Sequence, residues 1–175
     1  MISLMQKIQE IEFLLSLQIQ RNHVILNNGK IGFDQICNPK LMTFNLKNDT
    51  LVKIIYIPLD IATNRTGVGH LATPIVYYPK IYKRFLEMII FIADPRFRFL
   101  IIYDSFKKSI CRIESDFMKS ADVIVSITDQ NFTYTDGILS LTGLGDELYY
   151  VLVSAKKIHK IKVKTNGLYP NKEET

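Results

Sequence analysis

The sequence predicts an α/β or α+β fold, built as a single domain around a mixed β-sheet. Apolar runs joined by turn-forming residues predict N-terminal hairpins, and a strand–helix–strand pattern predicts a central βαβ unit. Short apolar runs near the end predict a C-terminal antiparallel meander. The sheet is expected to be mixed because hairpins join antiparallel strands, whereas a βαβ unit joins parallel ones.

Length and composition are those of an ordinary globular chain. The 175 residues are 47% hydrophobic and 22% charged, which is unlike the low hydrophobicity and high net charge of disordered chains. We expect one globular domain over residues 1–164. Residues 165–175 combine Gly, Pro and charged residues, and we expect a flexible tail there.

The first third of the sequence predicts a helix followed by two hairpins. Residues 3–19 carry apolar side chains at helical spacing, so we expect an amphipathic helix. Asn28-Gly29 lies between two apolar runs, and both residue types tolerate positive φ, which favours a hairpin. Residues 41–46 and 51–59, separated by a polar turn, predict the second hairpin.

The middle of the chain predicts helices that alternate with buried strands. Apolar residues at i, i+4, i+7 and i+11 predict a core-facing helix over 79–93. Residues 97–104 are then predicted to form a buried strand, residues 105–121 a helix, and residues 122–129 another strand. This order is that of a βαβ unit, whose two strands are parallel neighbours in one sheet.

The last part of the chain returns to antiparallel signals. Asp136-Gly137 between apolar runs predicts a tight hairpin, because this pair suits a type I′ turn. Residues 147–164 then supply one long strand or two short ones. We expect these strands to close the domain as an antiparallel meander.

Charge and cysteine content favour a cytoplasmic protein without a membrane span. The net charge of +5, from 22 Lys and Arg against 17 Asp and Glu, permits contact with a polyanion but does not require it. Two distant cysteines do not make a disulfide framework, and charges in the apolar N-terminal segment interrupt a signal-peptide core. Three N-x-T sequons, at Asn48, Asn64 and Asn131, would then never meet the glycosylation machinery.

Two strand-ending aspartates form the candidate catalytic and metal site. Asp104 and Asp129 each close an apolar run, and the predicted βαβ unit would bring both to one edge of the sheet. Paired carboxylates there could hold Mg²⁺, which prefers oxygen ligands, and support cleavage of a phosphodiester. The alternative is structural, because aspartate also begins turns and caps helices.

Residues 62–80 combine two glycines with Arg65 and His70 and are expected to form a long loop. The segment lacks the lysine and hydroxyl of a phosphate-binding P-loop and the third glycine of a dinucleotide-binding turn. Arg65 is a candidate anion ligand, and His70 is a candidate catalytic residue, with a packed, non-catalytic histidine as the alternative. A loop of about twenty residues also fits a lid, because compact domains seldom leave such lengths without a purpose.

A lysine stripe near the C-terminus is the candidate binding surface. Three of its lysines alternate with Ile161 and Val163, which places them on one face of a strand. Such a stripe suits the phosphates of a nucleic acid or another polyanion. The alternative is an edge strand whose lysines prevent pairing with other chains. The stripe comprises Lys156, Lys157, Lys160, Lys162 and Lys164.

The sequence leaves three functions open. The first is a cytoplasmic protein that binds nucleic acid or another polyanion through the lysine stripe. The second is a Mg²⁺-dependent nuclease or nucleotide-processing enzyme that uses Asp104 and Asp129. The third is a homo-oligomeric structural protein, such as a homodimer joined through residues 3–19, because a terminal helix that is apolar around most of its girth needs a partner.

Overall fold

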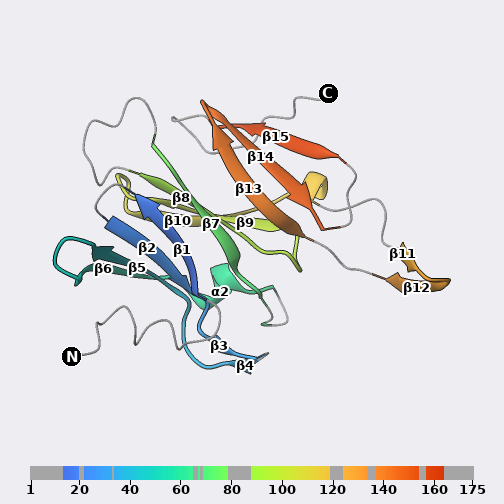
Figure 1. The fold of residues 1–175 in the computed structure, drawn as a ribbon, viewed down its shortest axis with the longest axis horizontal. Helices are drawn as coiled ribbons and strands as arrows, with labels where there is room; N and C mark the ends of the chain where they lie inside the picture. The colour runs from blue at the N-terminus through green and yellow to red at the C-terminus, as the bar shows by residue number, and fades with distance from the viewer. Residues whose placement is uncertain are drawn as a thin grey trace. The chain divides into compact units, whose positions relative to one another are not determined.

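The chain, shown as a computed structural model in Figure 1, divides into two compact units. The first unit is Met1–Val68 and the second is Gly69–Thr175. Both are built from antiparallel β-sheets. The structure describes residues 14–19, 22–32, 34–64, 67, 69–78, 88–118, 124–133, 137–153 and 157–163.

The first unit is built on a four-stranded antiparallel sheet. Its strands, in the order in which they lie, are β1 (Leu14–Ile19), β2 (Asn22–Asn27), β5 (Lys40–Asn45) and β6 (Thr50–Tyr56). β5 and β6 are joined by the turn at residues 46–49, which confirms the second hairpin predicted from the sequence. The chain after β6 makes one helical turn, α2 (Leu59–Ala62).

A small hairpin of β3 (Lys30–Ile31) and β4 (Asp34–Gln35) separates β2 from β5 in sequence. Gly29 begins it with a φ of 73°, and a Cβ there would lie 2.1 Å from the carbonyl oxygen of Cys37. Only glycine fits, because both the positive φ and the close backbone exclude a side chain. The predicted hairpin across Asn28-Gly29 is wrong, since β2 pairs with β1 and β5.

Burial differs across the first sheet. The central strands β2 and β5 are buried on both faces, and Ile25, Met42 and Phe44 form an apolar cluster. β6 is an edge strand, and four of its apolar side chains are exposed, on both faces of the sheet. These exposed side chains are Leu51 (42%), Val52 (49%), Ile54 (40%) and Tyr56 (61%).

The second unit begins with another four-stranded antiparallel sheet, again with its strands in sequence order. The strands are β7 (Ala72–Tyr77), β8 (Ile89–Ala93), β9 (Phe99–Asp104) and β10 (Ser109–Glu114). Every residue of β8 and β9 is buried, which explains their continuous apolar sequences. β7 is an edge strand, and it can therefore hold Pro74, which has no N–H to donate to a neighbour.

A three-stranded antiparallel sheet follows in the second unit. Its strands are β13 (Ile138–Leu144), β14 (Glu147–Leu152) and β15 (Ile158–Lys162). Successive strands pair, so the antiparallel meander expected at this end of the chain is present, with two short strands after residue 146. The 3-10 turn η1 (Asp116–Met118) and a separate hairpin of β11 (Ile124–Ile127) and β12 (Gln130–Thr133) precede it in sequence.

The two larger sheets of the second unit pack around a shared apolar core. Figure 1 shows β13 beside β7, and the hydroxyl of Thr73, at a bulge in β7, donates a hydrogen bond to the carbonyl oxygen of Leu139 (3.1 Å). Alternate residues of β14 face inward, as expected for a half-buried strand. The core consists of Ile89, Phe91, Ala93, Leu100, Ile102, Met118, Ile138, Leu141, Leu148, Tyr150, Leu152 and Val163.

The turn between β8 and β9 is fixed by a buried carboxylate. Asp94 has no exposed surface, and it accepts hydrogen bonds from the backbone N–H groups of His70 (2.5 Å), Arg96 (2.8 Å) and Phe97 (3.0 Å). Burial raises the pKa of Asp94 above its ordinary value, although these N–H donors act in the opposite direction. The carboxylate thereby ties the segment before β7 to the β8–β9 turn.

The start of β13 is held against the same turn. The N–H of Gly137 donates to the carbonyl of Pro95 (2.9 Å), and the N–H of Ile138 donates to the carbonyl of Asp94 (3.0 Å). A Cβ on Gly137 would lie 2.2 Å from the carbonyl oxygens of both Asp94 and Phe97. We call residues 94–97, together with Gly137, the Asp94 junction.

The predicted α/β or α+β fold with a central βαβ unit is wrong, because the described residues are nearly all β-strand in antiparallel sheets. The segment predicted as a helix over 105–121 begins with a turn and continues as β10, which pairs with β9. The strands predicted as parallel neighbours, 97–104 and 122–129, lie in different sheets, because β11 pairs with β12. The βαβ unit therefore does not form.

Two other helix predictions and one hairpin also fail where the structure describes them. Residues 89–93 of the predicted helix 79–93 form β8, and residues 14–19 of the predicted helix 3–19 form β1. β8 is buried on both faces and is apolar at every position, so its sequence satisfies helical spacing as well. The hairpin across Asp136-Gly137 is absent, since β12 pairs with β11 and β13 with β14.

The remaining parts of these predictions, residues 3–13 and 79–87, lie outside the described residues, as does the predicted tail at 165–175. Within the described ranges, no helix has both the length and the apolar character needed to cross a membrane.

Candidate functional site

The outer face of the β13-β14-β15 sheet carries the candidate site. Alternation along β14 turns Leu148 and Tyr150 into the core, so Glu147, Tyr149 and Val151 face outward. The pairing register places Tyr149 opposite Thr142 of β13 on one side and opposite a lysine of β15 on the other. The outer face therefore combines hydroxyl, apolar and charged side chains.

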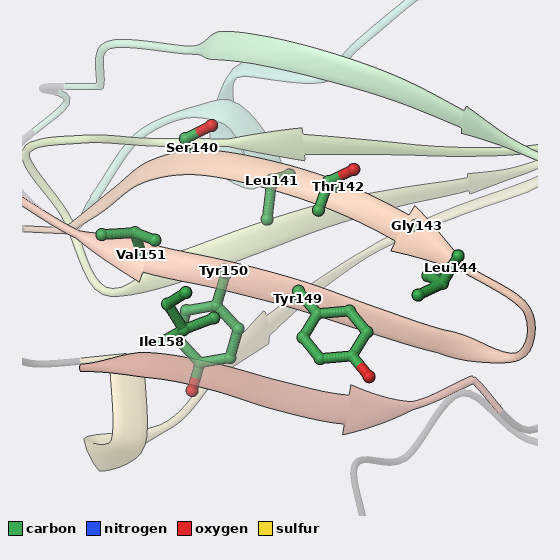
Figure 2. A pocket seen from close by; sticks show the side chains of 9 residues that line it. All are labelled: Ser140, Leu141, Thr142, Gly143, Leu144, Tyr149, Tyr150, Val151 and Ile158. Carbon is green, nitrogen blue, oxygen red and sulfur yellow. The ribbon is translucent and has the colours of Figure 1, made fainter.

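A shallow hollow of about 360 Å³ lies on this face. Figure 2 shows the ring of Tyr149 over β14, with Leu144 beyond it on β13 and Ile158 on β15. Leu144 and Ile158 are each 72% exposed, so the hollow has a largely apolar rim. Its lining residues are Ser140, Leu141, Thr142, Gly143, Leu144, Tyr149, Tyr150, Val151 and Ile158.

Glu147 connects the hollow to the lysines of β15. Its Oε2 accepts a hydrogen bond from the Tyr149 hydroxyl (2.5 Å), and its Oε1 accepts one from Nζ of Lys160 (2.9 Å). The bond from Tyr149, followed by that from Lys160, lowers the pKa of Glu147. The same bond raises the pKa of the Tyr149 phenol. Glu147 is thus an anion whose charge is matched by its neighbours on the sheet.

Replacing Glu147 by glutamine is expected to lower the pKa of Tyr149 towards its ordinary value of 10.0. A neutral amide favours the protonated phenol less than a carboxylate does. The titration of ¹³C-labelled tyrosines, followed by NMR, measures this change. Glu114→Gln is the control, because Glu114 pairs with Arg112 on β10 (2.9 Å). An unchanged Tyr149 titration in Glu147→Gln contradicts the assigned hydrogen bond.

The lysine stripe is partly neutralised. Lys160 pairs with Glu147, and Lys162 lies opposite Glu147 in the pairing register. Lys157 is exposed, whereas Lys156 and Lys164 lie outside the described residues. Phosphate binding relies on cations that replace counterions, and a carboxylate among the lysines weakens that field. Both Lys160 and Lys162 lie on the outer edge strand, where charged side chains oppose pairing with another sheet.

The two strand-ending aspartates lie in the turns of different hairpins. Oδ1 of Asp104 accepts hydrogen bonds from the N–H groups of Phe106 and Lys107 (both 3.0 Å) in the β9–β10 turn. Thr128 and Asp129 form the β11–β12 turn with φ of 46° and 62°, as in a type I′ turn. No shared sheet edge brings the aspartates together. In the part of the chain that the structure describes, no group of three or more His, Cys, Asp or Glu residues could hold a metal ion.

The segment that contains His70 is only partly a loop, because some of its residues form a strand. Residues 72–77 of the predicted loop 62–80 form β7, and Arg65 lies outside the described residues. His70 is half-buried, and its backbone N–H donates to Asp94. The structure therefore gives this segment an anchoring contact next to the edge of a sheet.

The sequence alone did not predict the pairing of Glu147 with Tyr149 and Lys160. One signal was available, because residues two apart on a strand share a face. The lysines of β15 alternate in the same way. The register of β14 against β15, which sets Tyr149 opposite Lys160, depends on the fold and could not be read from the sequence.

Comparison with known proteins points to one family. The profile of the family described as "Major royal jelly protein" matches residues 24–171. Major royal jelly protein 9 of Apis mellifera is 32% identical over 145 residues, which cover 80% of this chain and 33% of that protein. Major royal jelly protein 1 of the same species is 29% identical over 78% of this chain and 33% of that protein. Major royal jelly protein 3 is 33% identical over 72% of this chain and 24% of that protein.

Proposed function

The chain belongs to the major royal jelly protein family, and from this premise we propose that it is part of a secreted protein with a nutritional role. The observation that supports the proposal is the family match over residues 24–171, which reaches into both compact units. The matched relatives are named as major royal jelly proteins, and the family is a secreted, nutritional one. The chain spans about a third or less of the length of these relatives.

The architecture agrees with this family, which has a β-propeller-like fold. Propeller blades are four-stranded sheets repeated along the chain. The β1-β2-β5-β6 sheet and the β7-β8-β9-β10 sheet each have four antiparallel strands in sequence order. The repeated meander thus accounts for the antiparallel sheets that the α/β prediction missed.

Family membership corrects two further predictions. Nucleic-acid binding through the lysine stripe and Mg²⁺-dependent nuclease activity are wrong, because the family is a nutritional or yolk-like one. Cytoplasmic localisation is also wrong, because proteins of this family are secreted. That prediction rested on charges in the first residues and on a low cysteine content. Neither feature by itself determines where a protein is located.

The proposed secretion is tested by locating the native protein. We expect mass spectrometry to find peptides from residues 88–118 and 137–153 in a secretion of the source organism, at higher abundance than in washed cells. An abundant cytosolic protein measured in the same samples controls for cell lysis. Recovery of the peptides from cells alone would contradict secretion.

The proposed nutritional role is tested separately. Digestive proteases are expected to degrade the natural protein completely to short peptides under gut conditions, because a food protein must release its amino acids. Intact sheets surviving prolonged digestion would contradict a nutritional role, whatever the site of secretion.

A further inference from the structure

Tyr149 lies at the centre of the outer face of the β13-β14-β15 sheet, where its side chain lines the hollow. Two residues away along β14, Glu147 and Val151 lie on the same face. The pairing register places Thr142 of β13 and Lys160 of β15 directly opposite Tyr149. The aromatic ring therefore has an acid, an apolar side chain, a hydroxyl and an amine as its four neighbours on this face.

Hydrogen bonds fix the position of the Tyr149 ring. Its hydroxyl donates to Oε2 of Glu147 (2.5 Å), and Nζ of Lys160 donates to Oε1 of the same carboxylate (2.9 Å). Figure 2 shows the ring face-on over β14, with its hydroxyl turned towards β15. An aromatic ring that is already held in place can stack on a ligand at a small cost in side-chain entropy.

The polar groups around the ring can form further hydrogen bonds. The Glu147 carboxylate has lone pairs for about four hydrogen bonds, and two of these are used among the described residues. The Glu147 side chain is 32% exposed, so a ligand can reach the remaining lone pairs. Ser140 and Thr142 are exposed on β13, and their hydroxyls can both donate and accept. A ligand with an apolar centre and a rim of hydroxyls fits this pattern.

Charge and shape narrow the class of ligand. The described residues that line the hollow are all uncharged, and Glu147 beside it is paired with Lys160, so a neutral ligand is favoured. The hollow is shallow and covers one face of a ligand, leaving the other face in water. A long aliphatic chain would keep much of its apolar surface in water there, which is unfavourable. A pyranose ring has a flat C–H face for the tyrosine and hydroxyls that remain hydrated.

We propose that the hollow binds a neutral hexopyranose, whose flat C–H face stacks on the ring of Tyr149. The weakly positive hydrogens of that face lie against the negative face of the aromatic ring. Hydroxyls at one edge of the sugar donate to the Glu147 carboxylate, and others bond to the hydroxyls of β13. β-Glucopyranose suits the site, because its hydroxyls are equatorial and both faces of its ring are C–H surfaces. This binding is additional to the proposed nutritional role and does not depend on secretion.

Binding is measured on the full chain by saturation-transfer NMR with cellobiose, a disaccharide of β-linked glucose. We expect saturable binding, with the strongest transfer to C–H protons on one face of a sugar ring. These protons should also move upfield, because they lie in the ring current of Tyr149. Sorbitol, which has similar hydroxyls but no ring, is the control ligand and should not bind. Absence of cellobiose binding, or equal binding of sorbitol, overturns the proposal.

Substitutions at Tyr149 test whether the ring is the platform. Tyr149→Leu keeps an apolar side chain on β14 but removes the ring, and it should weaken cellobiose binding about tenfold or more. Tyr149→Phe keeps the ring and should keep most of the binding. Tyr56→Leu makes the same change at an exposed tyrosine of β6 and should leave binding unchanged. Equal affinities in Tyr149→Leu and Tyr56→Leu overturn the proposal.

Two further measurements test the polar contact and the class of ligand. Glu147→Gln should weaken cellobiose binding, because the amide has one acceptor oxygen in place of two, whereas Glu114→Gln on β10 should not. An unchanged affinity in Glu147→Gln contradicts the contact assigned to the carboxylate. The competing ligand is aliphatic, and n-hexanol is its probe. Saturation transfer from the protein to n-hexanol but not to cellobiose, lost in Tyr149→Leu, overturns the proposal in favour of an aliphatic ligand.

Discussion

Replacing Gly137 by alanine is expected to lower the free energy of unfolding by about 3 kcal/mol or more. The new Cβ would lie 2.2 Å from the carbonyl oxygens of Asp94 and Phe97. Both are backbone atoms of a turn whose N–H groups are held by the Asp94 carboxylate, so neither can move without breaking those bonds. The start of β13 would have to leave the Asp94 junction, which opens the core shared by the two sheets.

Urea unfolding followed by circular dichroism measures this loss. Gly145→Ala is the matched control, because Gly145 has a φ of 63° but, apart from its chain neighbours, no described residue has a heavy atom within 4 Å of the position that a Cβ would take. That substitution should cost about 1 kcal/mol, from backbone conformation alone. Equal, small losses in the free energy of unfolding of both variants would show that the carbonyl oxygens of Asp94 and Phe97 lie less close to Gly137 than the structure indicates.

Replacing Asp94 by alanine is expected to cost about 3 kcal/mol. The substitution removes the acceptor of three backbone N–H groups, and buried donors without partners are unfavourable. It also detaches His70 from the β8–β9 turn. Urea unfolding of Asp94→Ala beside Asp129→Ala, which changes an exposed turn residue, provides the comparison. Equal unfolding midpoints in the two variants would contradict a structural role for the Asp94 carboxylate.

Asp94 should also make stability depend on pH in a known direction. Its folded pKa is raised above the ordinary 3.8, so between the two values the folded state binds more protons than the unfolded state. The contribution of this raised pKa to stability is complete at a pH below the pKa of Asp94 in the unfolded state. It is lost as the pH rises through the pKa of Asp94 in the folded state. Asp94→Asn cannot titrate, so the wild type should lose stability relative to it over that window. Parallel profiles of unfolding midpoint against pH would contradict the raised pKa.

Several strands were predictable from the sequence, whereas their partners were not. The β5–β6 hairpin and the strand character of residues 99–104 follow from apolar runs bounded by turn residues. β8 was assigned to a helix because its continuous apolar run also satisfies helical spacing, and β9 was assigned to a parallel pair because such runs are typical of buried parallel strands. Here the same runs form the two central strands of an antiparallel sheet, where packing buries both of their faces.

The candidate site was also predictable from the sequence only in part. Asp104 was recognised as a residue that could begin a turn, and it does so, but its position after a strand also resembled that of a ligand-binding carboxylate. Lys160 and Lys162 were correctly placed on one face, yet Glu147 comes from another strand. Side chains that meet across strands depend on register, and register depends on the tertiary structure.

The connectivity of the sheets has a kinetic consequence. In the described part of the chain, every pairing joins consecutive strands except that of β2 with β5, which encloses the β3–β4 hairpin. Closing the short turns within each meander costs little entropy, so strands that are neighbours in the sequence can pair readily. Each meander can therefore form as soon as its own strands have been synthesised. The docking of β13 at Gly137 joins segments more distant in sequence, and we expect it to be a later, slower event.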